Sequence, residues 1–212
     1  EPGVMISKFI EGLNTTGNIV DIGSGDCQWF PAVERSIDRY YAIEANVNAL
    51  NLAPQNEKLI HINMNVFDDD FDLKNLTEAK INYALFSFFL SHFSDNTIFR
   101  LLKKLQSIDS LIVIDSFWSN DHRKKYITKD LKNINRKLPD KAIQLPKRFF
   151  EISDLEKIGK AFDFSVTKFE QGNYWFACLM KRKINSESSI YKKRFLRPAE
   201  HFPNSPPNEK FP

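Results

Sequence analysis

The stretch GNIVDIGSGDCQWF, residues 17–30, joins an apolar run to a turn with two glycines separated by one residue. The chain has 7 glycines, and Gly17, Gly23 and Gly25 all fall within this stretch. The apolar run predicts a buried strand over 17–23, and glycines after it permit unusual backbone angles and a close approach by another molecule. The stretch therefore predicts a strand that ends in a ligand-binding turn.

Strand-like and helix-like segments alternate along most of the chain. Strands are expected over 40–46, 58–65, 81–90 and 110–118, with two more joined by a turn over 164–182, and helices over 29–40, 95–108 and 153–162. Asp95 and a Ser153–Glu156 capping box are the expected helix starts. This order predicts an α/β fold: a doubly wound, mostly parallel seven-stranded sheet with helices on both faces and an antiparallel C-terminal hairpin.

Two segments stand apart from this alternation. Residues 119–150 are rich in lysine and arginine and lack strand signals, so we expect a helix and loop that form either a solvated face or a cover over an acceptor site. Residues 184–212 include half of the 10 prolines and predict a tail. The remaining alternation predicts one domain over 1–183.

Bulk composition narrows the class of protein. The chain is 42% hydrophobic and 27% charged, with a net charge of +3, as expected of a cytoplasmic globular protein without a concentrated nucleic-acid surface. No apolar run is long enough to span a membrane, and residues 1–4 do not start a signal peptide. The two cysteines and four histidines are scattered, which predicts neither disulfides nor a metal site.

A carboxylate falls where the second strand is expected to end. Glu44 lies 19 residues after Gly25, and strand ends of a parallel sheet share one edge, so its carboxylate is expected to grip the hydroxyls of a ribose. Gln28 occupies the third position of a dinucleotide G-x-G-x-x-G fingerprint, and no phosphate-binding Gly-Lys-Ser/Thr is present. The pattern thus favours a nucleoside with only a small anionic group.

These motifs, taken in order, resemble those of class I S-adenosylmethionine-dependent methyltransferases over roughly residues 15–182. The matching segments are VDIGSGDC (20–27), YYAIEAN (40–46), NMNVFDDDF (63–71) and LFSFFLSHFSD (85–95). The terminal hairpin is also typical of that family. A narrower similarity is to a bacterial subgroup that acts on small molecules, some on sugars or polysaccharide ends.

The resemblance implies a Rossmann-like fold and S-adenosyl-L-methionine as cofactor. The cofactor contacts that it implies are Asp21, Gly23, Ser24, Gly25, Glu44, Ala45, Asn65, Val66 and Phe86. Asp21 would orient the glycine loop through backbone N–H bonds, and Asn65, or Asp68 if the register shifts, would lie near the adenine. Phe86 or Ser87 would lend backbone carbonyls to the methionine amino group.

Two positions depart from the family's pattern. Cys27 stands where a third glycine is usual, and Asn65 stands where an aspartate is usual. The asparagine oxygen can still accept the hydrogen bond from the adenine amino group. These departures keep open a second hypothesis, that the chain is a binding module that has lost its reaction.

The expected reaction is methyl transfer to a small-molecule or glycan-like acceptor, at a hydroxyl. His92 and Asp115 follow the fourth and fifth strands at the ligand edge, so they are the catalytic candidates, although either could be purely structural. Trp118 is placed to stack on an acceptor, and the basic segment would attract a phosphate, a carboxylate or an acidic sugar. That segment also keeps an RNA methyltransferase open as an alternative.

Overall fold

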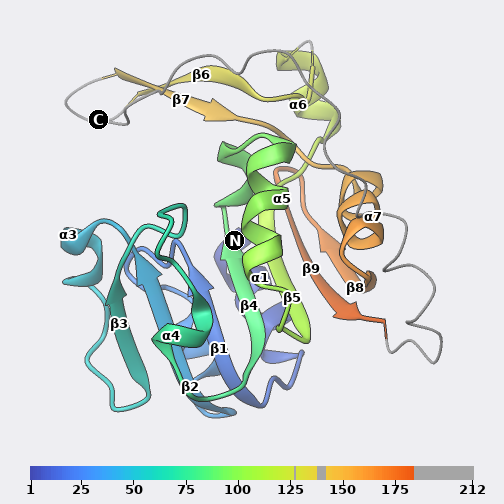
Figure 1. The fold of residues 1–212 in the computed structure, drawn as a ribbon. Helices are drawn as coiled ribbons and strands as arrows, with labels where there is room; N and C mark the ends of the chain where they lie inside the picture. Colours follow the sequence, from blue (N-terminus) through green and yellow to red (C-terminus); the bar gives the residue numbers. More distant parts are fainter. Residues whose placement is uncertain (127, 138–141, 184–212) are drawn as a thin grey trace, which may run out of the picture.

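A mostly parallel seven-stranded sheet forms the centre of the computed structural model, which describes residues 1–126, 128–137 and 142–183 (Figure 1). The strands are β1 (Gly17–Ile22), β2 (Ile37–Glu44), β3 (Leu59–Asn63), β4 (Ile81–Ser87), β5 (Ser110–Ser116), β8 (Phe164–Gln171) and β9 (Trp175–Arg182). Their order is β3-β2-β1-β4-β5-β9-β8. The first five pair in parallel, and β9 runs antiparallel to both β5 and β8. The predicted fold class and its C-terminal hairpin are confirmed.

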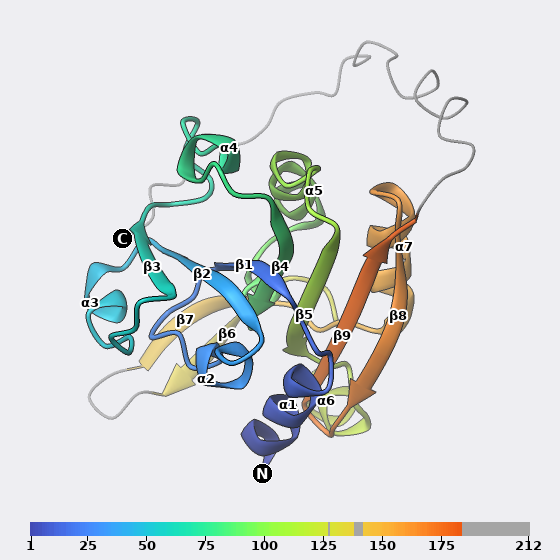
Figure 2. The same ribbon diagram turned by 90° about the horizontal axis from the view of Figure 1, so that it is seen from below.

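Helices cover both faces of this sheet, as Figure 2 shows. One face carries α1 (Pro2–Glu11), α2 (Phe30–Val33) and α3 (Val47–Leu50), and the other carries α4 (Leu73–Leu76), α5 (Asp95–Lys104) and α7 (Ile152–Ala161). Alternate strand residues belong to the two cores: Ile19 lies in the core that contains residues of α1 and α2, whereas Val20 lies in the core that contains residues of α5 and α7. The alternation places both strand faces in apolar surroundings, as the sequence predicts.

The predicted helix over 29–40 is wrong for most of its length. Only the four residues of α2 are helical, and Ile37 already begins β2. The spacing of Phe30, Val33 and Ile37 suits a helix, but Ile37 reaches the same apolar core from a strand. Such a short helix also cannot supply the anion site that a long helix following the glycine turn would offer.

Two helix starts are displaced from their predicted residues. Ser94, not Asp95, caps α5, because its Oγ accepts a hydrogen bond from the Thr97 backbone N–H (3.3 Å). The α7 box lies two residues before the predicted Ser153–Glu156 pair: the Asp154 carboxylate accepts from the Glu151 backbone N–H (2.9 Å). α1 was not predicted at all.

The basic segment contains strands where a helix and a loop were expected. After the short helix α6 (Asn120–Lys125), β6 (Lys132–Lys137) and β7 (Ala142–Lys147) form a two-stranded antiparallel hairpin outside the main sheet. Figures 1 and 2 both place this hairpin beyond the edge where β4, β1 and β2 end. Polar alternation hid these strands, and Pro146 is tolerated because a two-stranded hairpin has free edges.

Among the described residues, no helix combines the length and apolarity needed to cross a lipid bilayer. The same part of the chain holds no group of three or more His, Cys, Asp and Glu side chains arranged to bind a metal ion. The predicted tail over 184–212 lies outside the described residues.

Candidate functional site

The glycine turn after β1 adopts the left-handed backbone that its sequence predicts. Gly23 has φ +70° and Gly25 has φ +56°. The N–H groups of Gly23 and Ser24 both donate to the Ile43 carbonyl of β2, at 2.8 and 3.2 Å. Cys27, at the position of the family's third glycine, also takes a left-handed φ of +60°. The turn therefore keeps a glycine-like path there at a steric cost of about 1–2 kcal/mol.

The two glycines face different surroundings. A Cβ placed on Gly23 would come within 2.3 Å of the Phe89 ring, whereas one on Gly25 would meet nothing within 4 Å. The close approach to Gly23 thus comes from the protein's own aromatic side chain. The backbone beside Gly25 is the open part of the turn, where another molecule can approach.

Glu44 ends β2 directly beside this open backbone. Its Oε2 accepts a hydrogen bond from the Gly25 N–H (3.0 Å), and its Oε1 accepts one from the Asn46 N–H (2.8 Å). Sequence reasoning missed Asn63, whose Nδ2 donates to the carbonyls of Glu44 and Ala45 and so fixes the end of β2 against β3. The carboxylate is held at the turn, and its contact with a ribose remains a prediction.

Asp21 is buried beneath the turn and has a different partner from the one expected. Its Oδ2 accepts from the Tyr40 hydroxyl (2.6 Å), and no loop N–H is bonded to it. Burial, with a smaller contribution from Glu44, raises the pKa of Asp21 to about 7. The Asp21 Oδ1 and the Ser24 Oγ are both buried without a hydrogen-bond partner among the described residues. Two unpaired oxygens beside a glycine turn suit a ligand that brings hydrogen-bond donors.

The remaining cofactor candidates lie at the same edge with less direct geometry. Asn65 is exposed, and its Oδ1 accepts from the Phe67 N–H (3.1 Å), so it closes a local turn. Val66 is buried in the core, and Phe67 stacks on Phe89 at 6.2 Å. Phe86 is fully buried one residue inside the end of β4. Whether any of them contacts a cofactor remains a prediction.

His92 lies half-buried at the end of a 3₁₀ turn, η1 (Leu90–His92), that follows β4. Its Nδ1 lies 2.7 Å from the Pro146 carbonyl of β7. A carbonyl can only accept, so Nδ1 carries the proton and Nε2 of the neutral ring keeps its lone pair. Burial, then the Lys147 charge, lowers the pKa of His92 below its usual 6.5. The geometry supplies a neutral imidazole at neutral pH.

Asp115 is fully buried and already engaged. Its carboxylate accepts from the N–H groups of Ser91 (2.9 Å) and Ser116 (2.7 Å), and Lys147 lies 3.6 Å away. The Lys147 ammonium also donates to the Ser91 hydroxyl. Asp115 thus holds the turn bearing His92 and the base of β7, and this placement suits a positioning role better than proton transfer.

A cavity of about 400 Å³ lies past the end of β5, beside the β8–β9 turn. Its lining residues are Phe117, Trp118, Ser119, Asn120, Asp121, Arg123, Gln171, Gly172 and Asn173. Trp118 is largely buried, and its ring lies parallel to that of His122, with 6.5 Å between the ring centres. Sequence reasoning did not single out His122. No residue of the glycine turn lines this cavity, so it is separate from the Gly25–Glu44 site.

No family model matches the chain, and no curated protein matches it significantly in sequence. Solved structures do match. A DhpI complex with SAM and HEP is 13% identical over 85% of this chain and 84% of that one, with a TM-score of 0.68. A Listeria monocytogenes protein described as a putative S-adenosylmethionine-dependent methyltransferase is 11% identical over 85% and 98%, with a TM-score of 0.62. The glycopeptide N-methyltransferase MtfA is 9% identical over 85% and 90%, with a TM-score of 0.61. The chain has the fold of class I methyltransferases.

Proposed function

We propose that the protein is an S-adenosyl-L-methionine-dependent methyltransferase acting on a hydroxyl of a small-molecule or glycan-like acceptor. The observation that carries the proposal is the pairing of an open, left-handed Gly25 with the Glu44 carboxylate 3.0 Å from its N–H. Structural neighbours support it, because complexes with SAH and with SAM are among them.

The residues around the turn fit such a cofactor. Glu44 would bind the ribose hydroxyls, since a carboxylate accepts two hydrogen bonds from a diol. The unpaired oxygens of Asp21 and Ser24 would accept from the methionine ammonium group. A sulfonium and an ammonium both carry positive charge, and the carboxylate of Glu44 complements them.

His92 supplies the chemistry that the protein adds. When bound, the cofactor offers an activated methyl group, whose transfer to a hydroxyl forms a C–O bond, breaks the C–S bond and releases the hydroxyl proton. His92 Nε2 receives that proton, because Nδ1–H is committed to Pro146. Asp115 and Lys147 keep the η1 turn in place while the proton moves.

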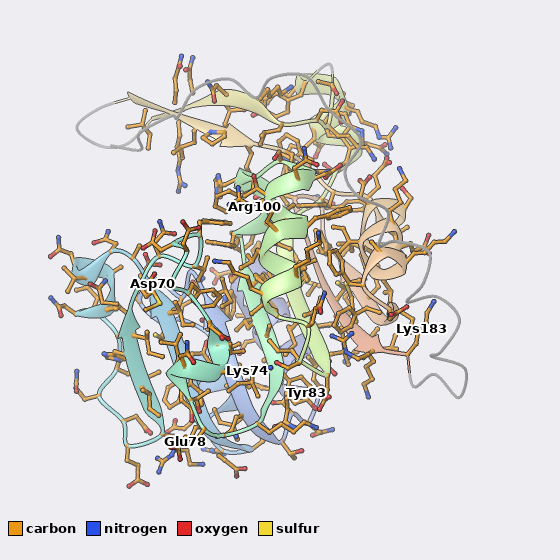
Figure 3. The ribbon with its side chains drawn as sticks, in the orientation of Figure 1. Asp70, Lys74, Glu78, Tyr83, Arg100 and Lys183 are labelled. Atoms are coloured by element: carbon orange, nitrogen blue, oxygen red, sulfur yellow. The ribbon has the colours of Figure 1, made fainter. Side chains whose placement is uncertain are left out.

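The test is calorimetric titration of S-adenosylhomocysteine into the wild type and Glu44→Gln. Losing a charge-assisted contact should weaken binding by roughly 10- to 100-fold, since such bonds contribute about 1.5–3 kcal/mol. The control is Glu78→Gln, an exposed carboxylate that Figure 3 shows at the end of the molecule opposite the β6–β7 hairpin. Absence of binding by the wild type, or equal affinity in Glu44→Gln, would contradict the proposal.

A further inference from the structure

The β6–β7 hairpin has two chemically distinct faces. Its register pairs Ile134 with Leu145 and Arg136 with Ile143, and alternate residues point to opposite sides. The inner face consists of Lys132, Ile134, Arg136, Ile143, Leu145 and Lys147. The outer face includes Asn133, Asn135 and Gln144, which are exposed. Polar residues thus face the solvent, and aliphatic and cationic residues share the other side.

The inner face is turned toward the carboxyl edge of the sheet. Lys147 contacts Ser91 and Asp115 there, and Nδ1 of His92 lies 2.7 Å from the Pro146 carbonyl of the same strand. The Arg136 charge is a minor cause, beside burial, of the lowered pKa of both His92 and Lys147. The base of the hairpin is also tied to this edge by the Arg148–Asp95 ion pair. The inner face and the imidazole of His92 therefore border the same space.

The inner face carries one guanidinium, Arg136, that has no carboxylate partner among the described residues. Lys147 is paired with Asp115, and His92 is neutral at neutral pH because its pKa is lowered. Arg136 is exposed, and within the described part of the chain no carboxylate forms an ion pair with it. A guanidinium presents a planar fork of donors that matches a carboxylate or phosphate.

Beside this cation lies an apolar surface. Ile134, Ile143 and Leu145 are only half-buried, although they lie on the side of the hairpin that faces the sheet. Aliphatic side chains left partly uncovered next to a guanidinium complement a molecule with an apolar part and an anionic group.

We propose that the inner face of the β6–β7 hairpin binds the acceptor, and that the acceptor is a small organic acid whose phosphate or carboxylate pairs with Arg136. This inference rests on the proposed function, since it names the substrate class of the same site. The hairpin would hold the anionic group while the acceptor's hydroxyl lies against His92 Nε2.

The test uses phenyl phosphate and benzoate as probes, with benzyl alcohol as the neutral analogue. Each is titrated by NMR into the protein alone and into protein saturated with S-adenosylhomocysteine. We expect saturable binding of at least one acid, no saturable binding of the alcohol, and an affinity about tenfold lower in Arg136→Gln, which corresponds to about 1.4 kcal/mol. Arg35→Gln, exposed just before β2, is the matched control and should bind like the wild type.

Three results would overturn the inference. The first is no saturable binding of either acid, or equal binding by the wild type and Arg136→Gln. The second is weakened binding in Arg123→Gln alone, which would move the anion to the cavity past β5. The third is tighter binding of a single-stranded RNA 20-mer with a steep salt dependence, which would indicate a nucleic-acid surface. The protein could also bind the acids through Arg136 and fail to bind S-adenosylhomocysteine. That result would contradict the proposed function and support the anion site.

Discussion

At the scale of single residues, the site depends on groups whose partners come from distant parts of the chain. Asp21 is a buried acid held by Tyr40, and His92 is a half-buried base held by a carbonyl 54 residues away. Burial shifts the pKa of each toward its neutral form, upward for the acid and downward for the imidazole. The two shifts lead to separate predictions.

The free energy of unfolding of Asp21→Asn, relative to that of the wild type, should increase as the pH rises. The pKa of Asp21 is about 7 in the folded chain against 3.8 ordinarily, so the folded state keeps a proton that the unfolded state has lost. The stability that this group gives the wild type is therefore fully present only below pH 3.8 and is lost as the pH rises from there to about 7. Urea unfolding at pH 5 and pH 8 should show the advantage of Asp21→Asn growing by roughly 2–3 kcal/mol. A constant difference would refute this, and Asp26→Asn, exposed in the same turn, is the control.

His92→Gln should reduce methyl transfer while leaving cofactor affinity unchanged. General bases contribute about 10²–10⁴-fold, and the amide can keep the bond to Pro146 but cannot take a proton at neutral pH. Because burial lowers the pKa of His92, the wild-type rate should fall only below pH 6.5, and the variant should lack this step. Rates are measured with labelled S-adenosylmethionine and an acidic, hydroxylated acceptor.

The control for this experiment is His122→Gln. His122 is held in a similar way, with Nδ1 2.6 Å from the Phe117 carbonyl, but it belongs to the aromatic cluster around Trp118. A full rate in His92→Gln, together with a loss in His122→Gln, would transfer the proposed role to His122.

At the scale of elements, the β6–β7 hairpin lies outside the seven-stranded sheet and shares no strand pairing with it. Its strands pair only with each other, and its base is held by contacts of Lys147 and Arg148 with the η1 turn and α5. Further anchoring comes from Lys129, whose ammonium lies 2.8 Å from the carboxylates of both Glu151 and Asp154. The hairpin can therefore be shortened without opening the core.

Replacing residues 134–145 with an Asn-Gly turn should separate cofactor binding from catalysis. This dipeptide closes a tight hairpin, and Lys147 keeps its contacts. We expect S-adenosylhomocysteine affinity within about twofold of wild type, because the hydrogen bonds that hold the Glu44 carboxylate come from Gly25 and Asn46, and a loss of methyl transfer. Calorimetry and a labelled-methyl assay check both. Lost cofactor binding with an unchanged melting temperature would show that the hairpin holds the cofactor.

At the scale of the whole molecule, one face of the sheet is covered by α1, a helix that the sequence analysis did not predict. α1 covers one face of the sheet through Ile6, Phe9 and Ile10, which are all buried. The Phe9 ring also lies under the Lys168 ammonium of β8, 4.8 Å from its centre. The first residues of the chain thus contribute to the core on which the strands carrying the site rest.

Phe9→Ala should lower the free energy of unfolding by about 3–5 kcal/mol, the usual cost of truncating a buried aromatic side chain. Urea denaturation measures it. Met5→Ala, on the exposed side of the same helix, should change stability by less than about 0.5 kcal/mol. Equal effects of the two substitutions would mean that α1 does not seal the core.

The sequence by itself determined the fold class, the strands of the main sheet and the neighbourhood of the glycine turn and Glu44. Those features are local: apolar runs mark buried strands, and parallel strands bring their ends to one edge. The glycines could be recognised because few other residues tolerate the left-handed angles found at Gly23 and Gly25.

Only the tertiary structure decided the contacts between segments far apart in the chain. Tertiary packing ends α2 at Val33 and places the Phe89 ring against Gly23. It also pairs Asp21 with the Tyr40 hydroxyl, and the basic segment forms a hairpin beyond the sheet edge. These outcomes depend on which side chains meet across the core, and a periodic pattern carries no record of partners that lie dozens of residues away.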